Sequence, residues 1–451
     1  MNRPSIARYF IIAAMTATLV SSCRKHDELP PNKVTKHSSE VLDKWITLQL
    51  RLMRNATGIP NHAMSRQFAY SGITALEAIA PGLPSNARWT AKWNGLTNLP
   101  APHTAYNCYY PANVNAAMAA INKAMFANAK QADMQAIDSL EAALNAEFAG
   151  KQSPEVLARS IEFGKAVAAA VYNWSESDGY KNNDPYTPPT GPGKWVPTPP
   201  SMLPAASPYW GNNRTVISGS IANTQPPPPV SYSTEPNSAF YQMAKQVYDV
   251  SQQLTDDQKA AAMFWRDVPG VSSPGHWLSI LQQAMQKKPT RLDKAALAYA
   301  LTGAAVHDAI ISCWKTKYQY NLVRPITYIR NTMGHSNWNS AIGTPAHPEY
   351  ASGHAVLSSA AADVLTALFG NSGTFTDHTY DYMGMAPRTY TSFSAIAKEA
   401  ADSRLWGGIH YRTTLDLGLL QGSKVTRNIL SAGDNYQLFS DNRNESSQKV
   451  D

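Results

Sequence analysis

The sequence has few cysteines, few charged residues and no dense basic block, and each shortage excludes a class of protein. Only three of its 451 residues are cysteines, and none stands in a metal-ligand spacing such as C-x-x-C, so no cysteine-bound metal site is predicted. Charged residues make up 16% and hydrophobic residues 43%, which indicates neither a disordered chain nor a polytopic membrane protein. The net charge of +7 comes without a dense basic block, so it suits anionic ligands and predicts no nucleic-acid partner.

The amino-terminal apolar run is too short to span a bilayer. It covers Tyr9 to Val20 after a basic start, and Val20-Ser21-Ser22-Cys23 follows. This tetrapeptide resembles a bacterial lipobox, whose cysteine becomes the lipidated first residue of the mature protein. We therefore expect residues 1–23 to be a lipoprotein signal, residues 24–36 to be a tether, and the exported chain to be anchored in the cell envelope at Cys23. A plain cleaved secretory signal is the alternative.

The other two cysteines are Cys108 and Cys313. Cys313 lies inside an apolar helical pattern, which favours a buried thiol. An oxidising envelope also permits a disulfide between the two, although nothing in the sequence argues for one.

Strand-like alternation is nearly absent, no repeat of fixed period is evident, and helical periodicity recurs along most of the chain. The helical patterns of residues 37–177 carry no clustered chemistry and predict a scaffold. Residues 237–432 predict a second helical unit, and residues 433–451 a polar tail. The predicted fold is all-α, built from helical bundles.

A proline-rich segment separates the two helical regions. Residues 178–236 hold 14 of the 31 prolines, a composition typical of a disordered linker. However, Trp195, Tyr209 and Trp210 are costly to leave in water. We therefore predict a long ordered loop wrapped over the fold, which could form a wall of a substrate entrance.

The most informative stretch is His347-Pro-Glu-Tyr-Ala-Ser-Gly-His354, which runs into an apolar segment, Ala355 to Phe369. The first N–H groups of a helix have no intrahelical partner, and the helix dipole adds about half a positive charge there, so such a position can receive an oxyanion. Ser352 adds a hydroxyl donor, Gly353 permits close approach of the backbone, and His354 can exchange a proton near neutral pH. Taken alone, the triplet is more typical of an ordinary N-cap.

Two further stretches add positive charge. Upstream lies Lys317-Tyr-Gln-Tyr-Asn-Leu-Val-Arg324-Pro325; if it is helical, both cations lie on one face about 10 Å apart and Pro325 ends the helix. Downstream, Arg404 closes an amphipathic helix, and the next two glycines free His410 to be aimed independently. So many permanent cations beside a helix mouth predict a multiply charged, phosphate-like anion.

The three stretches resemble the signature of the vanadium-dependent haloperoxidases and type-2 phosphatidic acid phosphatases, which is K-x6-R-P, then P-S-G-H, then S-R-x5-H. The internal spacings are intact, and Ala351 replaces the first proline of the middle block. The resemblance is close from Lys317 to His410 and looser from about Pro236 to Ala432.

What the resemblance implies is a vanadate cofactor, with phosphate able to occupy the same site. Carried over by position, His410 is the covalent ligand of the vanadium, and His354 is the acid–base residue that acts on hydrogen peroxide. The remaining cofactor-binding residues are Lys317, Arg324, Ser352, Gly353 and Arg404. In that family the metal acts as a Lewis acid, and halide is oxidised to hypohalous acid that attacks a small organic substrate.

Neighbouring residues carry mixed subfamily markers and leave the halide preference open. His347 resembles the algal bromoperoxidases, whereas Trp314, three residues before Lys317, resembles the fungal chloroperoxidase. Family members commonly place an aspartate four residues after the vanadium-binding histidine, where it orients the ring. Here that position is Thr414 and the nearest carboxylate is Asp416, so the support for the ring is in question.

Three other polar residues are left outside the predicted site. Asp308 falls on the opposite face of the helix from Lys317, and His276 and His307 are expected to have core or capping roles.

The leading hypothesis is a lipid-anchored, vanadate-dependent haloperoxidase. An envelope phosphatase of the same superfamily is the alternative; there His410 becomes a phosphohistidine and His354 protonates the leaving group. The absence of predicted transmembrane helices and the fuller local match H-P-E-Y-x-S-G-H favour the haloperoxidase. A non-catalytic envelope binding protein is a third possibility, supported only by Thr414.

Overall fold

The computed structural model describes residues 34–101, 108–287, 289–370 and 373–433. The predicted signal segment with Cys23, most of the tether and the tail after Gly433 lie outside the described residues.

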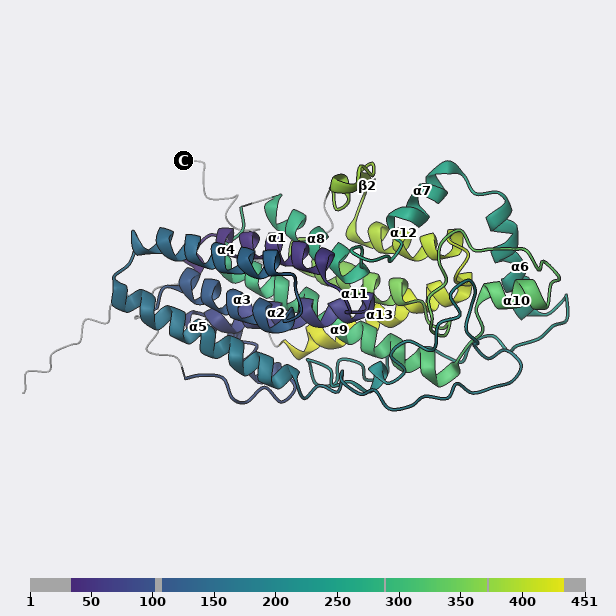
Figure 1. The fold of residues 1–451 in the computed structure, drawn as a ribbon, viewed down its shortest axis with the longest axis horizontal. Helices are drawn as coiled ribbons and strands as arrows, with labels where there is room; N and C mark the ends of the chain where they lie inside the picture. The colour runs from purple at the N-terminus through teal and green to yellow at the C-terminus, as the bar shows by residue number, and fades with distance from the viewer. Residues whose placement is uncertain (1–33, 102–107, 288, 371–372, 434–451) are drawn as a thin grey trace, which may run out of the picture.

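Helices dominate the described residues (Figure 1), and the named strands there form one short antiparallel pair that aligns Phe375 with Tyr390. The all-α prediction is confirmed. The helices are α1 (Glu40–Asn55), α2 (Met64–Ile79), α3 (Tyr110–Met125), α4 (Gln131–Ala149), α5 (Pro154–Ser175), α6 (Ala239–Gln252), α7 (Asp256–Phe264), α8 (Ser273–Gln286), α9 (Leu292–Tyr320), α10 (Pro325–Asn331), α11 (Gly353–Phe369), α12 (Phe393–Trp406) and α13 (Arg412–Ala432); the strands are β1 (Phe375–Asp377) and β2 (Arg388–Tyr390).

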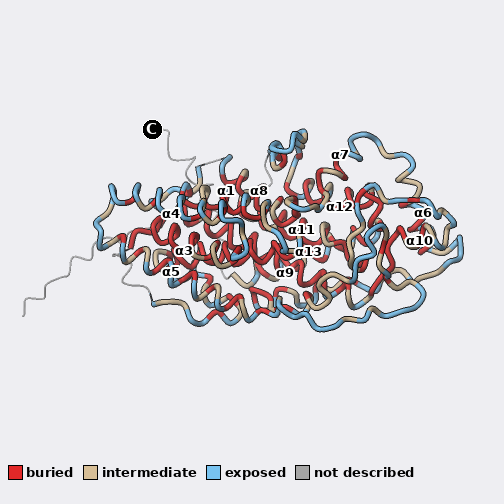
Figure 2. The backbone as a smooth tube through the Cα atoms, viewed as in Figure 1, coloured by how far each residue is buried: buried red, intermediate tan, exposed pale blue. Residues whose placement is uncertain are grey.

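Helix α9 lies at the centre, where α2, α11 and α13 pack against it (Figures 1 and 2). Two glycines allow the closest of these contacts. A Cβ added at Gly72 would lie 2.7 Å from the Tyr299 carbonyl oxygen, and one at Gly303 would lie 2.9 Å from the Phe68 carbonyl oxygen. Helix α9 is also long and apolar enough to cross a membrane, but its most apolar 18-residue window is entirely buried inside the protein. Its composition therefore reflects its central place in the core.

The connection between α9 and α10 corrects one prediction. The helix with Lys317 ends at Tyr320, because Asn321 adopts a left-handed conformation (φ 51°, ψ 45°) that terminates it. Arg324 is instead the N-cap of α10, and Pro325 occupies the first helical turn, where a missing N–H costs nothing. The expectation that Lys317 and Arg324 share one helix face is therefore wrong.

The proline-rich segment contains no α-helix but is an ordered loop that runs along the bundle towards α6 (Figure 1). Trp195 and Trp210 are both buried. The Asp308 carboxylate of α9 ties the loop down by accepting hydrogen bonds from Val216 N (2.8 Å), Ile217 N (3.2 Å) and the Ser220 hydroxyl (2.7 Å). The prediction of an ordered loop is confirmed, and Asp308 belongs to its attachment.

The buried-thiol prediction for Cys313 also holds. Neither Cys313 nor Cys108 is in a disulfide, and the Cys313 sulfur lies 3.4 Å from the Ala351 carbonyl oxygen.

Candidate functional site

Helix α11 opens on a serine that does not cap it. Ser352 occupies the N-cap position, but its side chain makes no capping hydrogen bond. The residue is fully buried, and its hydroxyl has no hydrogen-bond partner among the described residues. Elsewhere the same residue type caps as expected; Ser392 accepts from Ala395 N at 3.0 Å. A Cβ added at Gly353 would approach only the Trp314 ring, at 3.6 Å, within the described structure. The ordinary N-cap interpretation therefore fails, and the helix mouth keeps a donor and open space for an external acceptor.

Three buried cations act on His354 and His410. Lys317 donates to the backbone carbonyls of Pro348 (2.8 Å) and Glu349 (3.0 Å), and Arg404 donates to the Ser403 hydroxyl (3.0 Å). Arg324 donates to the carbonyls of His347 and Ile409, both at 2.9 Å. All three side chains belong to residues that are at most 1% exposed.

None of these cations has a carboxylate within 4.0 Å in the parts of the chain that the structure describes. Burial lowers the pKa of Lys317, and it lowers the pKa of Arg324 and of Arg404 to about 10. The charges of Glu349 and Asp267 act on these cations only from beyond this distance, and a buried charge without a close partner costs several kcal/mol. The arrangement is therefore complementary to an anion.

His410 is held at both ring nitrogens. Its Nδ1 lies 2.6 Å from Glu349 Oε1, and its Nε2 lies 3.2 Å from an Arg324 guanidinium nitrogen. The same Glu349 oxygen accepts from Thr414 Oγ1 at 2.6 Å and from Tyr411 N at 3.2 Å. Burial lowers the pKa of His410, and the charges of Arg324 and Lys317 lower it further, so the ring is neutral and its Nε2 lone pair accepts from Arg324.

His354 has a separate set of partners. Its Nε2 lies 2.8 Å from both the Trp265 carbonyl oxygen and Ser273 Oγ, and Ser273 in turn donates to Asp267 Oδ1 at 3.0 Å. Because the carbonyl can only accept, the proton of the ring lies on Nε2. Burial lowers the pKa of His354 well below its usual value, and the Arg404 charge adds to this, so the ring is neutral with Nδ1 as its basic nitrogen.

We call Lys317, Arg324, Arg404, His410 and the start of α11 the cradle. A group of aromatic rings, the aromatic wall, adjoins it. The Trp314 and His347 ring centroids are 5.0 Å apart, and His62 stacks on the other part of this wall, 4.3 Å from Trp314. Trp210 meets His62 edge-on at 4.8 Å. His347 is joined to the cradle itself, because Arg324 donates to its Nδ1 at 3.0 Å.

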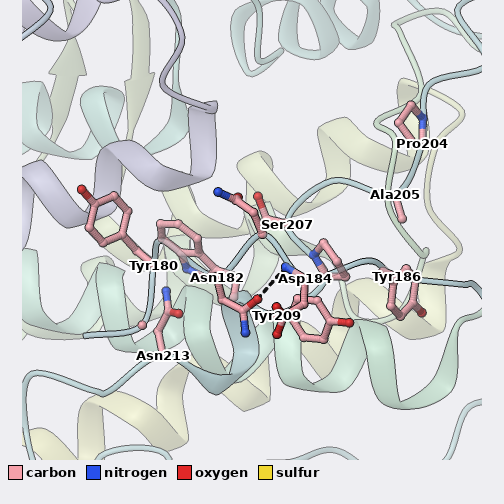
Figure 3. Close-up of a pocket in the computed structure, with 13 residues that line it drawn as sticks. Tyr180, Asn182, Asp184, Tyr186, Pro204, Ala205, Ser207, Tyr209 and Asn213 are labelled. Atoms are coloured by element: carbon pink, nitrogen blue, oxygen red, sulfur yellow. Dashed lines mark hydrogen bonds between the residues drawn. The ribbon is translucent and has the colours of Figure 1, made fainter. Parts of the chain in front are cut away.

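Trp210 also lines a cavity of about 350 Å³ formed by the proline-rich loop. Figure 3 shows Tyr180, Tyr186, Tyr209 and Asn213 around it, with the Asn182 side chain accepting from Asp184 N at 2.9 Å. The loop reaches the site segment directly, since Ala206 N donates to the Ala346 carbonyl at 2.7 Å. Four rings in successive contact, those of Trp210, His62, Trp314 and His347, therefore connect the cavity with Arg324.

The structure thus joins Lys317, Arg324 and His410 through short contacts and places Arg404 where its charge acts on His354. Two participants escaped sequence reasoning. Glu349, the acidic residue of the middle block, supplies the carboxylate beside the His410 ring that position 414 lacks. Its position in H-P-E-Y was the available sequence signal. His62 lies in a region without clustered chemistry, and no sequence signal marks it.

The residues left out of the predicted site are elsewhere. His276 Nε2 pairs with Asp377 at 2.6 Å under the Trp265 ring, and His307 Nδ1 lies 3.1 Å from Ser65 Oγ. Both histidines are buried in the core. No cluster of three or more His, Cys, Asp or Glu side chains suited to a metal cation occurs within the described ranges.

Comparison with known proteins gives one family model and several solved structures. Residues 297–437 match the model described as the VCPO second helical-bundle domain. A structure described as the first bacterial vanadium-dependent iodoperoxidase is 34% identical, with 88% of this chain and 96% of that chain covered at a TM-score of 0.78.

Two bacterial vanadium-dependent chloroperoxidase structures share the fold. The holo-type structure is 18% identical (85% of this chain and 94% of that chain, TM-score 0.63), and the apo-type structure is 16% identical (84% and 95%, TM-score 0.61). Comparison with curated proteins finds no significant match.

Proposed function

The chain belongs to the vanadium-dependent haloperoxidase family, and from this membership we propose that it oxidises iodide with hydrogen peroxide at a vanadate held by His410. The observation that carries the proposal is the set of buried cations, Lys317, Arg324 and Arg404, with no carboxylate within 4.0 Å among the described residues. Glu349 and Asp267 compensate these charges in part, and a multiply charged anion among them would complete the balance.

The donor set fits vanadate. Lys317, Arg324 and Arg404 would neutralise its oxygens, while the unpartnered hydroxyl of Ser352 and the Gly353 amide at the start of α11 would donate to it. His410 would be the protein ligand through Nε2, since Nδ1 is engaged by Glu349. When bound, the vanadate acts as a Lewis acid that activates peroxide towards halide.

His354 would move the proton of hydrogen peroxide. Its Nε2–H is held by the Trp265 carbonyl and by Ser273, which orients the ring and leaves Nδ1 to accept the proton. The low pKa of the buried ring keeps Nδ1 unprotonated near neutral pH. Asp267 fixes the direction of the Ser273 hydroxyl and so supports the same orientation.

Iodide is the proposed halide because the 34% identical relative is described as an iodoperoxidase, and iodide is the most easily oxidised of the common halides. The Trp314 and His347 rings beside the cradle are the proposed place of halide approach. The cavity lined by Tyr209 and Trp210 is the proposed place where an organic acceptor waits.

The proposed location is the cell envelope, with a lipid on Cys23. It is supported by the lipobox-like Val20-Ser21-Ser22-Cys23 sequence. Cys23→Ser should abolish labelling of the protein by a palmitate analogue in cells that export it. Normal processing at the same bond without lipid on the wild type would exclude the anchor.

The enzymatic proposal is tested with purified protein reconstituted with orthovanadate and assayed with peroxide and iodide, bromide or chloride in turn. We expect iodide oxidation that requires vanadate and is lost, together with vanadate binding, in His410→Ala. Phosphate should inhibit by occupying the same cradle.

One outcome would replace the haloperoxidase with the phosphatase. It is the absence of halide oxidation at saturating vanadate at every pH, together with efficient phosphate-ester hydrolysis by the vanadate-free protein. In that case an acid-free quench should trap a phosphohistidine at His410.

A further inference from the structure

We infer that Glu349 is the positioning residue of His410. It belongs to the middle sequence block, and it orients the His410 ring in the way that a carboxylate at position 414, on the helix after His410, would orient it. This assignment rests on the proposed function, because it concerns the histidine that would hold the vanadate. Its basis is the convergence of three donors on a single carboxylate oxygen.

The three donors belong to residues within one helical turn of each other, at the start of α13. His410 Nδ1 and Thr414 Oγ1 each lie 2.6 Å from Glu349 Oε1, and Tyr411 N lies 3.2 Å from it. An oxygen with three donors can act only as an acceptor, so Nδ1 of His410 must carry the proton that it donates. The neutral ring then has its lone pair on Nε2, which is the atom that faces Arg324 at 3.2 Å.

Glu349 is itself fixed from the opposite direction. Its backbone N donates to the Leu322 carbonyl at 3.0 Å, and its own carbonyl accepts from Lys317 Nζ at 3.0 Å. The residue is fully buried, so water does not compete for its carboxylate. One residue thus joins the connection after α9 to the start of α13, and the His410 ring inherits that rigidity.

Thr414 shows how the position at 414 is used when it lacks a carboxylate. Its hydroxyl lies 2.6 Å from Glu349 Oε1 and 2.8 Å from the Tyr411 carbonyl oxygen, so its one hydrogen is shared between these acceptors, and the residue is 2% exposed. Because Thr414 Oγ1 and His410 Nδ1 reach the same oxygen, an aspartate at position 414 lies within reach of the ring. The carboxylate can therefore be moved from one side of the ring to the other by two substitutions.

A purely structural role for Glu349 would be to balance the charge of the buried cations. The charge of Glu349 does act on Lys317 and Arg324, whose pKa values it raises against the effect of burial, but its carboxylate forms no ion pair within 4.0 Å with either in the described structure. Its second oxygen, Oε2, has no hydrogen-bond partner among the described residues. Every contact of the carboxylate that the structure records goes to His410, its neighbour Tyr411 or Thr414.

The test uses Glu349→Gln, Thr414→Asp and the double variant, with vanadate affinity measured by titration. Glu349→Gln keeps the shape and removes the charge that holds the Nδ1 proton, and we expect its vanadate affinity to fall on the order of 10- to 100-fold. Thr414→Asp alone places two carboxylates on one ring. The double variant has one carboxylate again and should recover most of the lost affinity.

Asp416→Asn is the matched control. It removes a carboxylate from the same helix, two residues beyond Thr414, and its side chain is 60% exposed. Its vanadate affinity should equal that of the wild type. A charge-balancing role predicts instead that Glu349→Gln leaves vanadate affinity unchanged or raises it, because the cations are then less compensated and attract an anion more strongly; that result would overturn the assignment.

A second measurement separates this inference from the proposed function and needs no vanadate. Nitrogen-15 chemical shifts of the vanadate-free wild type, with the His410 signals identified by their loss in His410→Gln, should show a protonated Nδ1 and an unprotonated Nε2. A ring protonated on Nε2 would refute the role of Glu349 even if the protein binds vanadate. The expected tautomer in a protein that binds no vanadate would leave the positioning intact and refute the function.

Discussion

Arg324 directs a guanidinium nitrogen at Nε2 of His410 across 3.2 Å, although the two residues are 86 positions apart in the sequence. Burial lowers the pKa of His410, and this permanent cation lowers it further, so the ring is neutral. The guanidinium occupies the Nε2 lone pair that would bind the vanadate, so Arg324 would have to shift from Nε2 to the anion when the anion enters. The other contacts, from Lys317 to the Glu349 carbonyl and from Glu349 to His410 Nδ1, are already in place without the anion, which reduces the free-energy cost of binding.

Orthovanadate should raise the thermal midpoint of the wild type, because a ligand that binds only the native state stabilises it by mass action; at 100 times its Kd the gain is about 2.7 kcal/mol. Arg404→Ala should lose most of this shift, since one cation of the buried set is gone. Arg51→Ala, which breaks an ion pair with Asp133 on the N-terminal helices, is the control and should keep the full shift. A wild-type midpoint that ignores millimolar vanadate would contradict the site.

Ser352→Ala should affect binding more than folding. Its hydroxyl makes no capping bond, so removing it should change the unfolding free energy of the vanadate-free protein by less than about 0.5 kcal/mol. Ser392→Ala removes a real cap on α12 and should cost about 1 kcal/mol. Urea unfolding gives both values, and vanadate titration should show weakened binding only in Ser352→Ala. Equal stability losses in the two variants would mean that Ser352 is an ordinary cap.

His354→Ala should spare vanadate binding and slow turnover roughly 100- to 10,000-fold, the usual worth of general acid–base help. Ser273→Ala removes one of the two acceptors that orient Nε2 and should give a smaller loss in kcat, with the Trp265 carbonyl still in place. Steady-state assays with iodide, together with vanadate titration, separate the two effects. A His354→Ala variant that turns over normally would remove this residue from the chemistry.

His307 should make the protein less stable in acid. Burial lowers its pKa to about 4, whereas the unfolded chain has the ordinary value near 6.5. Below pH 6.5 the unfolded state takes up the proton first, so the stability contribution present above pH 6.5 is lost progressively down to about pH 4. At 1.36 kcal/mol per unit, the loss is roughly 3 kcal/mol.

The comparison with His307→Gln isolates this effect, because neighbouring Asp308 has the opposite sign. Burial raises the Asp308 pKa to about 7, which favours the folded state as the pH falls. Unfolding free energies of the two proteins measured in urea at pH 7 and pH 4.5 should therefore diverge, with the wild type losing more. Parallel pH profiles would show that His307 titrates normally.

The helical architecture was open to prediction from the sequence alone. Periodic apolar residues, the Thr255 cap and the Pro-initiated starts of α5 and α8 are local signals, and local signals set where helices begin. The residue types of Lys317, Ser352, Arg404 and His410 led to the prediction of an oxyanion site, because charge and hydrogen-bond chemistry are carried by residue type.

Only the tertiary structure decided how the cradle is supported. The left-handed Asn321 ends α9 early and turns Arg324 towards His410, a change that helix periodicity does not reveal. Glu349 reaches His410 across 61 residues of sequence, whereas sequence reasoning looked for an aspartate one turn away. His62 joins the aromatic wall because α2 packs on α9 through two glycines. These are long-range contacts, and long-range contacts depend on how buried surfaces fit together, which no local pattern specifies.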